Sequence, residues 1–397
     1  MKGRKINIAI YSGTIPSSTF IEQLILSVSL HHNVLLFGRK PRKTLNSNLK
    51  ENISVYSYRN SKVLNVLFTG FRTMLLSIFY PKRLKLLLTQ IKRQNSGYKK
   101  RQFWFKATPV LLYLPDIFHI QWAKETVNWI FLQELGVKVV VSLRGAHINY
   151  SPISDKTLAN SYQKYFPKVD AFHAVSGAIA VEAQKYGADP KKIKLIHSLV
   201  PQTTFNRFSL PSEKKEEVIN ILSVGRHHWK KGYTTALDAC KLLKDKGISF
   251  RYSIIASSRM PEELFFQIYQ LELVDEVNFI SGLPQEEVFE KMHESDVLLL
   301  PSYEEGIANV VLEAMALGLP VISSDCGGMK EVVIHEETGF IVPVLGAKDI
   351  ASVLMSFEKM ALNGKIELVK NANKLIVSKF NEAQGVEKFN QFYESIL

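Results

Sequence analysis

Short apolar runs alternate with segments of helical periodicity along the first half of the chain. Each run spans four to seven residues and is apolar at nearly every position, as in strands that are covered on both faces. The predicted strands are Ile6–Tyr11, Val34–Phe37, Ile117–Gln121, Val137–Leu143, Ala171–Val175 and Ile193–Ile196, and the helices between them include Thr19–Leu30, Glu125–Leu135 and Ala178–Lys185. This order predicts βαβ units that build a parallel sheet.

The alternation resumes after a polar stretch between Pro201 and Val218, whose composition suits a linker. The second series predicts strands Ile219–Val224, Tyr252–Ala256, Val277–Ile280, Val297–Leu300, Val321–Ser323 and Phe340–Val342, with helices Thr234–Lys244, Glu262–Leu271, Glu286–Glu294 and Val310–Leu317. A chain of 397 residues also fits two hydrophobic cores better than one. The sequence therefore predicts an α/β protein with two doubly wound, Rossmann-like domains.

The domain boundaries follow from these two series. We predict a first domain over residues 1–201, a linker over 202–218 and a second domain over 219–380, followed by a helix over 381–397. Two such domains joined by a linker would face a central cleft, lined by the carboxyl ends of strands and the amino ends of helices. A cleft of this kind suits a substrate that carries an anion.

Charge is concentrated in the first domain. The whole chain carries a formal charge of +13, but the segment from Arg39 to Lys106 alone holds 17 basic residues and one acidic residue, Glu51, a balance of +16. The remainder of the chain is close to neutral, at −3. The charge excess is therefore a property of one region, the basic segment 39–106.

One apolar stretch inside the basic segment is long enough to be considered as a membrane span. It runs from Val63 to Tyr80 and contains Asn65 and Arg72, which share one helical face. The opposite face carries an apolar stripe of Leu64, Leu67, Phe71, Leu75 and Ile78. This pattern predicts an amphipathic helix rather than a spanning one.

The cysteine content and the first residues indicate a cytosolic protein. The two cysteines, Cys240 and Cys326, form neither a disulfide framework nor a metal-binding spacing, which suits a reducing compartment. The first apolar run is short and ends at Ser12 and Gly13, so we interpret it as a first strand and not as a signal peptide.

Several chemistries are excluded by the absence of their motifs. The chain contains no Gly-x-Gly and no Gly-Lys-Ser or Gly-Lys-Thr, which argues against a dinucleotide-binding fingerprint and a phosphate-binding loop. It contains no Asp-x-Asp, no His-Glu-x-x-His and no Gly-x-Ser-x-Gly. If the chain acts on a phosphorylated substrate, cationic side chains must do the work of a metal ion. We therefore expect no metal and no cofactor.

The region from Asp296 to Val344 holds the densest group of candidate residues. A buried strand ends at Pro301, a loop with Glu305 follows, and an apolar helix then carries a single charge, Glu313, in its first turns. An unpaired buried carboxylate is costly, although a carboxylate at the sheet rim could merely complement the helix dipole. Two carboxylates beside one strand, loop and helix could instead accept hydrogen bonds from sugar hydroxyls.

A second group opens the same domain, directly after the strand Ile219–Val224. Arg226 follows Gly225 at the end of the strand, and Lys231 precedes Gly232 where the next helix begins. A guanidinium and an ammonium group suit different oxygens of a diphosphate. Lysines in a polar loop are usually solvated, which is the alternative for Lys230 and Lys231.

These two groups together resemble the donor-binding domain of the family-four retaining glycosyltransferases of the GT-B fold. Glu305 and Glu313 match the Glu-x7-Glu motif of that family, and the resemblance covers about Ile219–Val344. It implies that Arg226 and Lys231 hold the diphosphate of a nucleoside-diphosphate sugar, that Glu313 binds the ribose and that Glu305 contacts the transferred sugar. It further implies retention of anomeric configuration, and a donor site completed by Gly225, Gly306, Ile307, Asn309 and Val310.

The first domain resembles the family less sharply. Gly13 lies in a stretch similar to the loop that approaches the donor phosphate, and His119 lies in a segment similar to the strand before the acceptor cleft. Where many members have His-Gly, this chain has Arg144 and Gly145, as polysaccharide-assembly members often do, with His147 nearby. The resemblance implies that Arg144, His147 and His119 serve the acceptor or donor side. For His147 a purely structural role stays open.

In this family the first domain holds the acceptor, so the basic segment 39–106 lies on the acceptor side. Its cations are interleaved with aliphatic and aromatic residues, which is typical of a surface that meets an anionic membrane. The alternatives are a solvated insertion and a nucleic-acid site, and the second lacks any accompanying RNA-binding motif. We expect an enzyme at the inner face of the cell membrane that uses a lipid-linked or glycan acceptor and binds no nucleic acid.

Two other functions stay open. A non-catalytic GT-B protein could bind a nucleotide sugar as an assembly module, and a nucleotide-sugar epimerase shares the fold. The complete set of Arg226, Lys231, Glu305 and Glu313 favours a transferase that assembles cell-surface polysaccharide.

Overall fold

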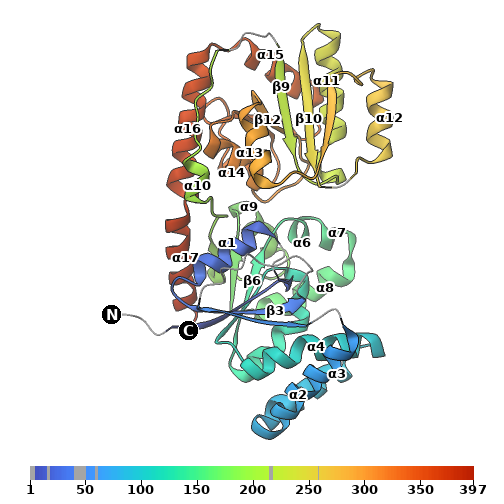
Figure 1. Cartoon of the computed structure of the whole chain (residues 1–397), viewed down its shortest axis with the longest axis vertical. Coiled ribbons are helices and arrows are strands. Elements are labelled where there is room, and N and C mark those ends of the chain that lie inside the picture. The colour runs from blue at the N-terminus through green and yellow to red at the C-terminus, as the bar shows by residue number, and fades with distance from the viewer. Residues whose placement is uncertain (1–4, 16–17, 40–50, 59–60, 214–217, 258) are drawn as a thin grey trace. The chain divides into compact units, whose positions relative to one another are not determined.

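A computed structural model describes residues 5–15, 18–39, 51–58, 61–213, 218–257 and 259–397. The chain divides into two compact units (Figure 1). Unit 1 consists of Met1–Ala174, Ala180–Ile196 and Val386–Leu397, and unit 2 consists of Val175–Ile179 and His197–Gly385. Part of the basic segment, namely residues 40–50 and 59–60, lies outside the described residues.

Unit 1 is built around a parallel sheet whose strand order is β2-β3-β1-β5-β6-β7-β8, with β4 paired to β3. Its strands are β1 Asn7–Tyr11, β2 Gly13–Thr14, β3 Asn33–Arg39, β4 Ile53–Tyr58, β5 Ile117–Ile120, β6 Lys138–Leu143, β7 Ala171–Ala174 and β8 Ile193–Leu195. Its helices are α1 Thr19–Val28, α2 Lys62–Phe79, α3 Pro81–Lys92, α4 Gly97–Tyr113, α5 Thr126–Trp129, α6 Ala146–Asn149, α7 Ser151–Ser154 and α8 Lys156–Tyr165. The central strands β5 and β7 are buried at every position, as expected for a sheet covered on both faces.

Two helices contain residues of both units. Helix α9, Gly177–Gln184, begins in unit 2 and ends in unit 1, and helix α17, Glu382–Glu394, does the same. The last turns of α17 contribute Phe389, Phe392 and Tyr393 to the core of unit 1, in the same apolar cluster as Ile8 of β1. The end of the chain is therefore an integral part of the first unit.

Unit 2 contains a second parallel sheet, of order β11-β10-β9-β12-β13-β14. Its strands are β9 Ile219–Val224, β10 Phe250–Ala256, β11 Val277–Ser281, β12 Val297–Leu300, β13 Val321–Ser324 and β14 Phe340–Val342. Its helices are α10 Gln202–Phe205, α11 Tyr233–Asp245, α12 Glu262–Gln270, α13 Gln285–His293, α14 Asn309–Leu317, α15 Ala347–Glu358 and α16 Leu362–Phe380. Two apolar clusters form its core, one around α14 and α16 and one around α11 and α15.

Unit 2 begins earlier than the linker predicted over 202–218. Its described residues from His197 onward already belong to the unit and include the short helix α10. The amide of Ser209 donates to the carbonyl of Leu317 at the end of α14, at 3.0 Å. A segment held by backbone hydrogen bonds needs no apolar side chains. Its polar composition therefore predicts a linker even though the segment belongs to unit 2.

The strand order defines one switch point in each sheet. In unit 2 the chain moves outward from β9 to β10 and β11 and then returns to the other side of β9 with β12. In unit 1 it moves outward from β1 to β3 and β4 and returns with β5. Loops that follow neighbouring strands at such a point diverge and leave a crevice at the carboxyl edge of the sheet, where open α/β sheets bind ligands.

Candidate functional site

Two loops of unit 2 meet at its switch point. The first, residues 225–232, follows β9 and ends in the short 3₁₀ turn Trp229–Lys231, and the second, residues 301–308, follows β12. The two strands are neighbours, with Leu298 opposite Leu222. Both candidate groups identified in the sequence therefore lie at one edge of one sheet.

Glycine permits the close approach of these two loops. Gly232 has a φ of +65°, and a Cβ atom at this position would lie 1.9 Å from the carbonyl oxygen of Pro301. Next to it, the amide of Tyr303 donates to the carbonyl of Lys230 at 2.6 Å. Because a side chain at residue 232 would push the loops apart, Gly232 keeps the turn that carries Lys230 and Lys231 against the loop that carries Glu305.

A third loop, after β13, supports the second one from behind. The amide of Gly328 donates to the carbonyl of Gly306 at 2.7 Å. A Cβ atom on Gly327, whose φ is +53°, would lie 1.6 Å from the carbonyl oxygen of Glu305. Backbone therefore packs directly on backbone at both sides of the loop, and this fixes the position of the Glu305 side chain.

Two lysines bind the carboxylate of Glu305 at the meeting point of the loops. Lys231 Nζ lies 2.8 Å from Glu305 Oε1, and Lys230 Nζ lies 3.1 Å from Oε2. Lys230 Nζ also donates to the carbonyl of Glu304 at 3.3 Å, and Ser302 Oγ donates to Glu305 Oε1 at the same distance. Burial by itself would raise the pKa of Glu305, but the charges of Lys231 and Lys230 outweigh it and hold this pKa below its ordinary value.

This cluster carries a surplus positive charge. Lys230 and Glu305 are 6% and 8% exposed, and one ionised carboxylate neutralises only one of its two ammonium partners. Arg226, at the end of β9, is exposed and adds a further cation to the same loop. The arrangement is therefore suited to bind an anion with more than one oxygen, such as a diphosphate.

The sequence did not identify Lys230. A lysine in a polar loop is usually solvated, and that expectation is wrong here because the turn at Gly232 directs Lys230 inward onto Glu305. The neighbouring pair of lysines before a glycine was the available signal, but it does not reveal which lysine is buried.

Glu313 stands apart from the lysines, on helix α14. It is half-buried, and Gln285 Nε2 donates to its Oε1 at 2.9 Å. Burial raises the pKa of Glu313 to about 7, and the hydrogen bond from Gln285 only partly opposes this. A carboxyl group that is partly protonated and partly ionised at neutral pH can form strong hydrogen bonds with hydroxyl groups of a ligand.

The remaining candidates of unit 2 surround these carboxylates. Gly225 donates its amide to Ile255 at 2.9 Å and lies so close to Lys231 that a Cβ atom would be 2.9 Å from Cε of that lysine. Gly306 is buried in the loop, whereas Ile307, Asn309 and Val310 are half-buried where α14 begins. The structure thus brings all the predicted residues of the second domain to the same edge of the sheet.

The candidates of unit 1 gather at the carboxyl ends of β1, β5 and β6, which are neighbours in the sheet. Gly13 follows β1 and has a φ of +83°. Arg144 follows β6; its Nη2 donates to Gln121 Oε1 at 3.2 Å, and its guanidinium carbon lies 4.7 Å from the centre of the Phe20 ring. Burial lowers the pKa of Arg144 to about 10, so this residue stays cationic at neutral pH.

Some polar atoms of this unit 1 cluster are buried without hydrogen-bond partners among the described residues. They are Arg144 Nε, His147 Nδ1 and Gln121 Nε2. Burial, with a contribution from Lys124, lowers the pKa of His147 to about 4, so its ring is neutral at neutral pH. Since buried polar atoms are normally paired, these three are suited to contact a ligand. Gln121 was not predicted as a site residue, although it ends a predicted strand.

His119 does not belong to this cluster of available atoms. Its side chain is fully buried in β5, and its Nδ1 lies 2.8 Å from Tyr393 Oη while its Nε2 lies 2.9 Å from Ser142 Oγ. Burial holds the pKa of His119 well below its ordinary value. Both ring nitrogens have partners within the core, so the structure gives His119 a structural role and does not place it among the unpaired atoms.

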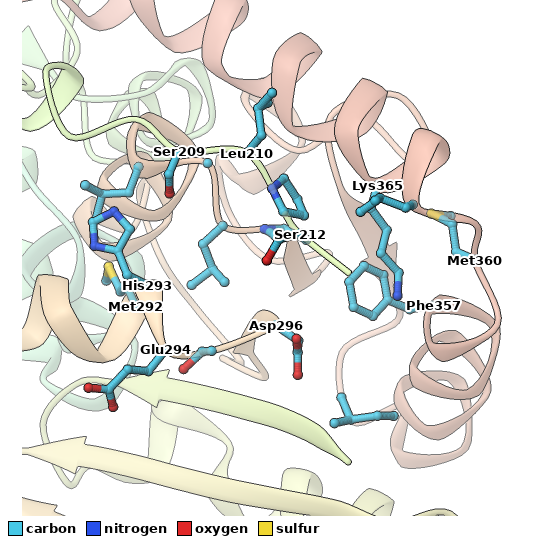
Figure 2. A pocket seen from close by; sticks show the side chains of 18 of the residues that line it. Ser209, Leu210, Ser212, Met292, His293, Glu294, Asp296, Phe357, Met360 and Lys365 are labelled. Carbon is cyan, nitrogen blue, oxygen red and sulfur yellow. The ribbon is translucent and has the colours of Figure 1, made fainter. Parts of the chain in front are cut away.

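A cavity of about 460 Å³ in unit 2 lies at the other edge of the sheet (Figure 2). Its lining includes Ile219 at the start of β9, Asp296 just before β12 and Pro320 just before β13. These residues mark the amino ends of strands, whereas Glu305 and Lys231 follow carboxyl ends. This cavity is therefore separate from the candidate site. In the described part of the chain, no group of three or more His, Cys, Asp or Glu residues could hold a metal ion.

The geometry suits an anionic ligand, and comparison with known proteins gives the family. Residues 203–378 match the family model of the glycosyl transferases group 1. The chain is 30% identical to the putative colanic acid biosynthesis glycosyltransferase WcaL of Escherichia coli strain K12, over 70% of this chain and 69% of that protein. It is also 30% identical to the amylovoran biosynthesis glycosyltransferase AmsK of Erwinia amylovora, over 71% and 70%.

The chain belongs to the glycosyl transferases group 1. Among solved structures, the sucrose-phosphate synthase of Thermosynechococcus elongatus aligns with a TM-score of 0.77 at 18% identity, over 99% of both chains. Anabaena HepE in complex with UDP aligns with a TM-score of 0.70 at 17% identity, over 99% of this chain and 100% of that one. The expected α/β class with two parallel sheets, the GT-B fold, is thereby confirmed.

Proposed function

We propose that this glycosyltransferase moves a sugar from a nucleoside-diphosphate sugar to a lipid-linked or polysaccharide acceptor in the synthesis of cell-surface polysaccharide. The observation that carries the proposal is the surplus positive charge of Lys230, Lys231 and Glu305 at the switch point of unit 2. The names of two relatives, which refer to colanic acid biosynthesis and amylovoran biosynthesis, support the acceptor class. The binding of UDP by HepE supports the donor class.

The cations of unit 2 would stabilise the leaving group. When the bond between the anomeric carbon and the phosphate oxygen lengthens, negative charge develops on the departing diphosphate and positive charge on the sugar ring. Arg226 and Lys231 are suited to receive this negative charge, and we propose that they do so without a metal ion. Lys231 would then exchange its contact with Glu305 for the phosphate, while Lys230 would keep Glu305 paired and ionised.

The carboxylates would orient the donor. Glu313, with a pKa raised to about 7, is suited to accept hydrogen bonds from the ribose hydroxyls, and its ionised form would be favoured by them. Glu305 would contact the transferred sugar, and Gly225, Gly306, Ile307, Asn309 and Val310 would line the donor site. In unit 1 we assign Gly13, Arg144 and His147 to the acceptor or donor side, supported by the unpaired Arg144 Nε and His147 Nδ1.

We propose that the reaction retains the anomeric configuration. The acceptor hydroxyl would attack the anomeric carbon on the face that the diphosphate leaves. The new bond joins the acceptor oxygen to the anomeric carbon, the bond from that carbon to the phosphate oxygen breaks, and the hydroxyl proton passes to the departing diphosphate. No protein group then needs to form a covalent intermediate.

We further propose that the enzyme works in the cytoplasm, on the inner face of the cell membrane. The exposed lysines of α3 and α4 in unit 1, among them Lys82, Lys85, Lys92, Lys99 and Lys100, support attraction to anionic lipid. Such a location would bring the enzyme to a lipid-linked acceptor. In the part of the chain that the structure describes, no helix is long and apolar enough to cross the bilayer.

Alanine variants of the two proposed diphosphate contacts test this function. We expect Arg226→Ala and Lys231→Ala each to reduce release of nucleoside diphosphate from the donor at least about 10²-fold, because each removes a preorganised cation. Added EDTA should change the wild-type rate little. Lys291→Ala is the matched control, because Lys291 pairs with Glu294 on the surface of α13.

The melting temperature of each variant separates lost chemistry from lost folding. Arg226 is exposed, so Arg226→Ala should melt within a few degrees of the wild type. If either folded variant turned over the donor at the wild-type rate, the assignment of the diphosphate to these cations would be wrong.

A further inference from the structure

Helix α2 of unit 1 has an inverted pattern of burial. The sequence predicts an amphipathic helix here, with Asn65 and Arg72 on its polar face. In the structure Asn65 and Thr69 are buried, at 8% and 2% exposure, whereas large apolar side chains of the same helix face outward. The side of α2 that packs against the protein therefore carries Asn65 and Thr69 together with the fully buried Leu76, and most of its large apolar side chains lie outside.

Contacts with α4 explain why the polar side faces inward. Helix α2 packs on α4, and α4 packs on strands β3 and β4 of the sheet, so α2 and α3 lie on the outer side of α4 (Figure 1). Trp104 Nε1 on α4 donates to Thr73 Oγ1 at 2.9 Å, and Thr73 Oγ1 donates to the carbonyl of Thr69 at 2.7 Å. The hydrogen bond from Trp104 thus joins α4 to the side of α2 that carries Thr69 and Thr73.

The outward residues form one continuous stripe. Val63, Leu67, Phe71, Met74 and Ile78 are spaced by three or four residues, as on one side of a helix, and each is between 49% and 68% exposed. Single exposed apolar residues are ordinary, but a stripe along a whole helix indicates a surface that another phase or molecule covers. We name these five residues the apolar stripe of α2; Leu67, Phe71 and Ile78 also belong to the stripe predicted from the sequence, whereas the predicted Leu75 is half-buried.

The charged residues near the apolar stripe indicate which kind of partner covers it. Helix α3 begins directly after α2, and its side chains Lys82, Lys85 and Lys92 are exposed, as are Lys99 and Lys100 of α4. The only acidic residue between Arg39 and Lys106 is Glu51. A second copy of this chain would bring the same cations against them, and like charges at an interface oppose association. An apolar and anionic partner fits, and a bilayer with anionic headgroups has both properties.

We propose that α2 lies in the interface of an anionic membrane, with its apolar stripe among the acyl chains and the lysines of α3 and α4 at the headgroup phosphates. The helix of 18 residues would lie along the membrane plane for about 27 Å. The inference extends the membrane location in the proposed function by naming the element that enters the lipid. It also adds an apolar contribution to binding, which salt does not screen.

Vesicle sedimentation tests the inserted stripe. The variant Leu67→Ser/Phe71→Ser changes two exposed positions, and the matched control Phe266→Ser/Tyr269→Ser changes two equally exposed aromatic residues on α12 of unit 2. We expect wild type and control to bind vesicles containing phosphatidylglycerol and to bind pure phosphatidylcholine at least tenfold less. The α2 variant should lose binding to the anionic vesicles at least tenfold.

Salt and a fluorescent probe distinguish insertion from surface attraction. Wild-type binding formed at low salt should persist in part at high salt, whereas that of the α2 variant should vanish. A dye attached at Phe71→Cys should shift its emission to the blue on anionic vesicles and be quenched by lipid-borne quenchers, since the native Cys240 and Cys326 are buried and poorly reactive.

Three results would overturn the inference. They are equal vesicle binding by the wild type and the α2 variant, an unshifted dye on bound protein, and a wild-type dimer that the α2 variant dissociates in the absence of lipid. Release of nucleoside diphosphate without vesicles should be the same in the α2 variant and the wild type. A wild type that binds vesicles through α2 but releases no diphosphate would support this inference and refute the proposed function.

Discussion

At the scale of single residues, the unusual feature is one carboxylate shared by two lysines. Glu305 is buried, and the charges and hydrogen bonds of Lys231 and Lys230 keep its pKa below the ordinary value. If Lys231 turns to the donor diphosphate, Lys230 becomes the remaining cation that keeps Glu305 ionised. We therefore propose that Lys230 acts through Glu305, as a positioning residue.

Lys230→Met should shift the acid limb of the pH–rate profile. In the variant, burial is opposed by only one lysine, so the pKa of Glu305 should rise and the carboxylate should become protonated at a higher pH than in the wild type. As the pH is lowered from 8 to 4, the variant should therefore begin to lose activity at a higher pH than the wild type does. The difference in activity between the two proteins should be smallest at pH 8. Release of nucleoside diphosphate across this range measures the shift.

Lys291→Met is the control for this shift, because the pair of Lys291 with Glu294 is exposed on α13 and surface pairs contribute little. Loss of activity by the same factor at every pH would mean that Lys230 serves only the stability of the loop.

At the scale of elements, the site depends on loops that approach one another through their backbones. The short apolar runs allowed most strands to be predicted, because a strand covered on both faces is apolar throughout. Strand β4, Ile53–Tyr58, was missed because its alternation of apolar and polar residues follows a long polar stretch. The direction that α2 faces could not be predicted either, since periodicity identifies two faces of a helix but not which one the protein covers.

Gly232→Ala should damage the site far more than Gly247→Ala. Both glycines have positive φ, +65° and +72°, so alanine would cost a backbone term of about 1–2 kcal/mol at each. At Gly232 the new Cβ atom would also clash with the carbonyl oxygen of Pro301. At Gly247 no atom lies within 4 Å of the position of the new Cβ atom. Overpacking of this kind typically adds about 1–3 kcal/mol.

The stability of the two variants is compared by urea unfolding, and their activity by release of nucleoside diphosphate from the donor. We expect Gly232→Ala to unfold at clearly lower urea and to lose diphosphate release, and Gly247→Ala to keep its activity. Equal effects of the two substitutions would contradict the close approach of the loops after β9 and β12.

At the scale of the whole molecule, the net charge of +13 arises in the basic segment 39–106, which carries +16 against −3 for the remainder. Unit 2 uses a few cations at one sheet edge, Arg226 and Lys231 among them, for which we propose a diphosphate partner. The basic segment of unit 1 contains α2, for which we propose a membrane partner. The α/β class could be predicted, and so could the meeting of the candidate residues of unit 2 at one sheet edge, because strand ends and their loops are local in sequence. The inward turn of Lys230 and the core role of His119 could not, because both depend on packing between distant segments.

The stereochemistry of donor cleavage tests the central proposal most directly. Wild-type protein would be given a panel of UDP-, GDP- and ADP-sugars, with release of nucleoside diphosphate measured and the first-formed sugar product observed by proton NMR before it mutarotates. The proposal predicts that at least one donor is cleaved and that the product keeps the anomeric configuration of that donor. Cleavage with inversion, or no cleavage of any donor by folded protein, would contradict it.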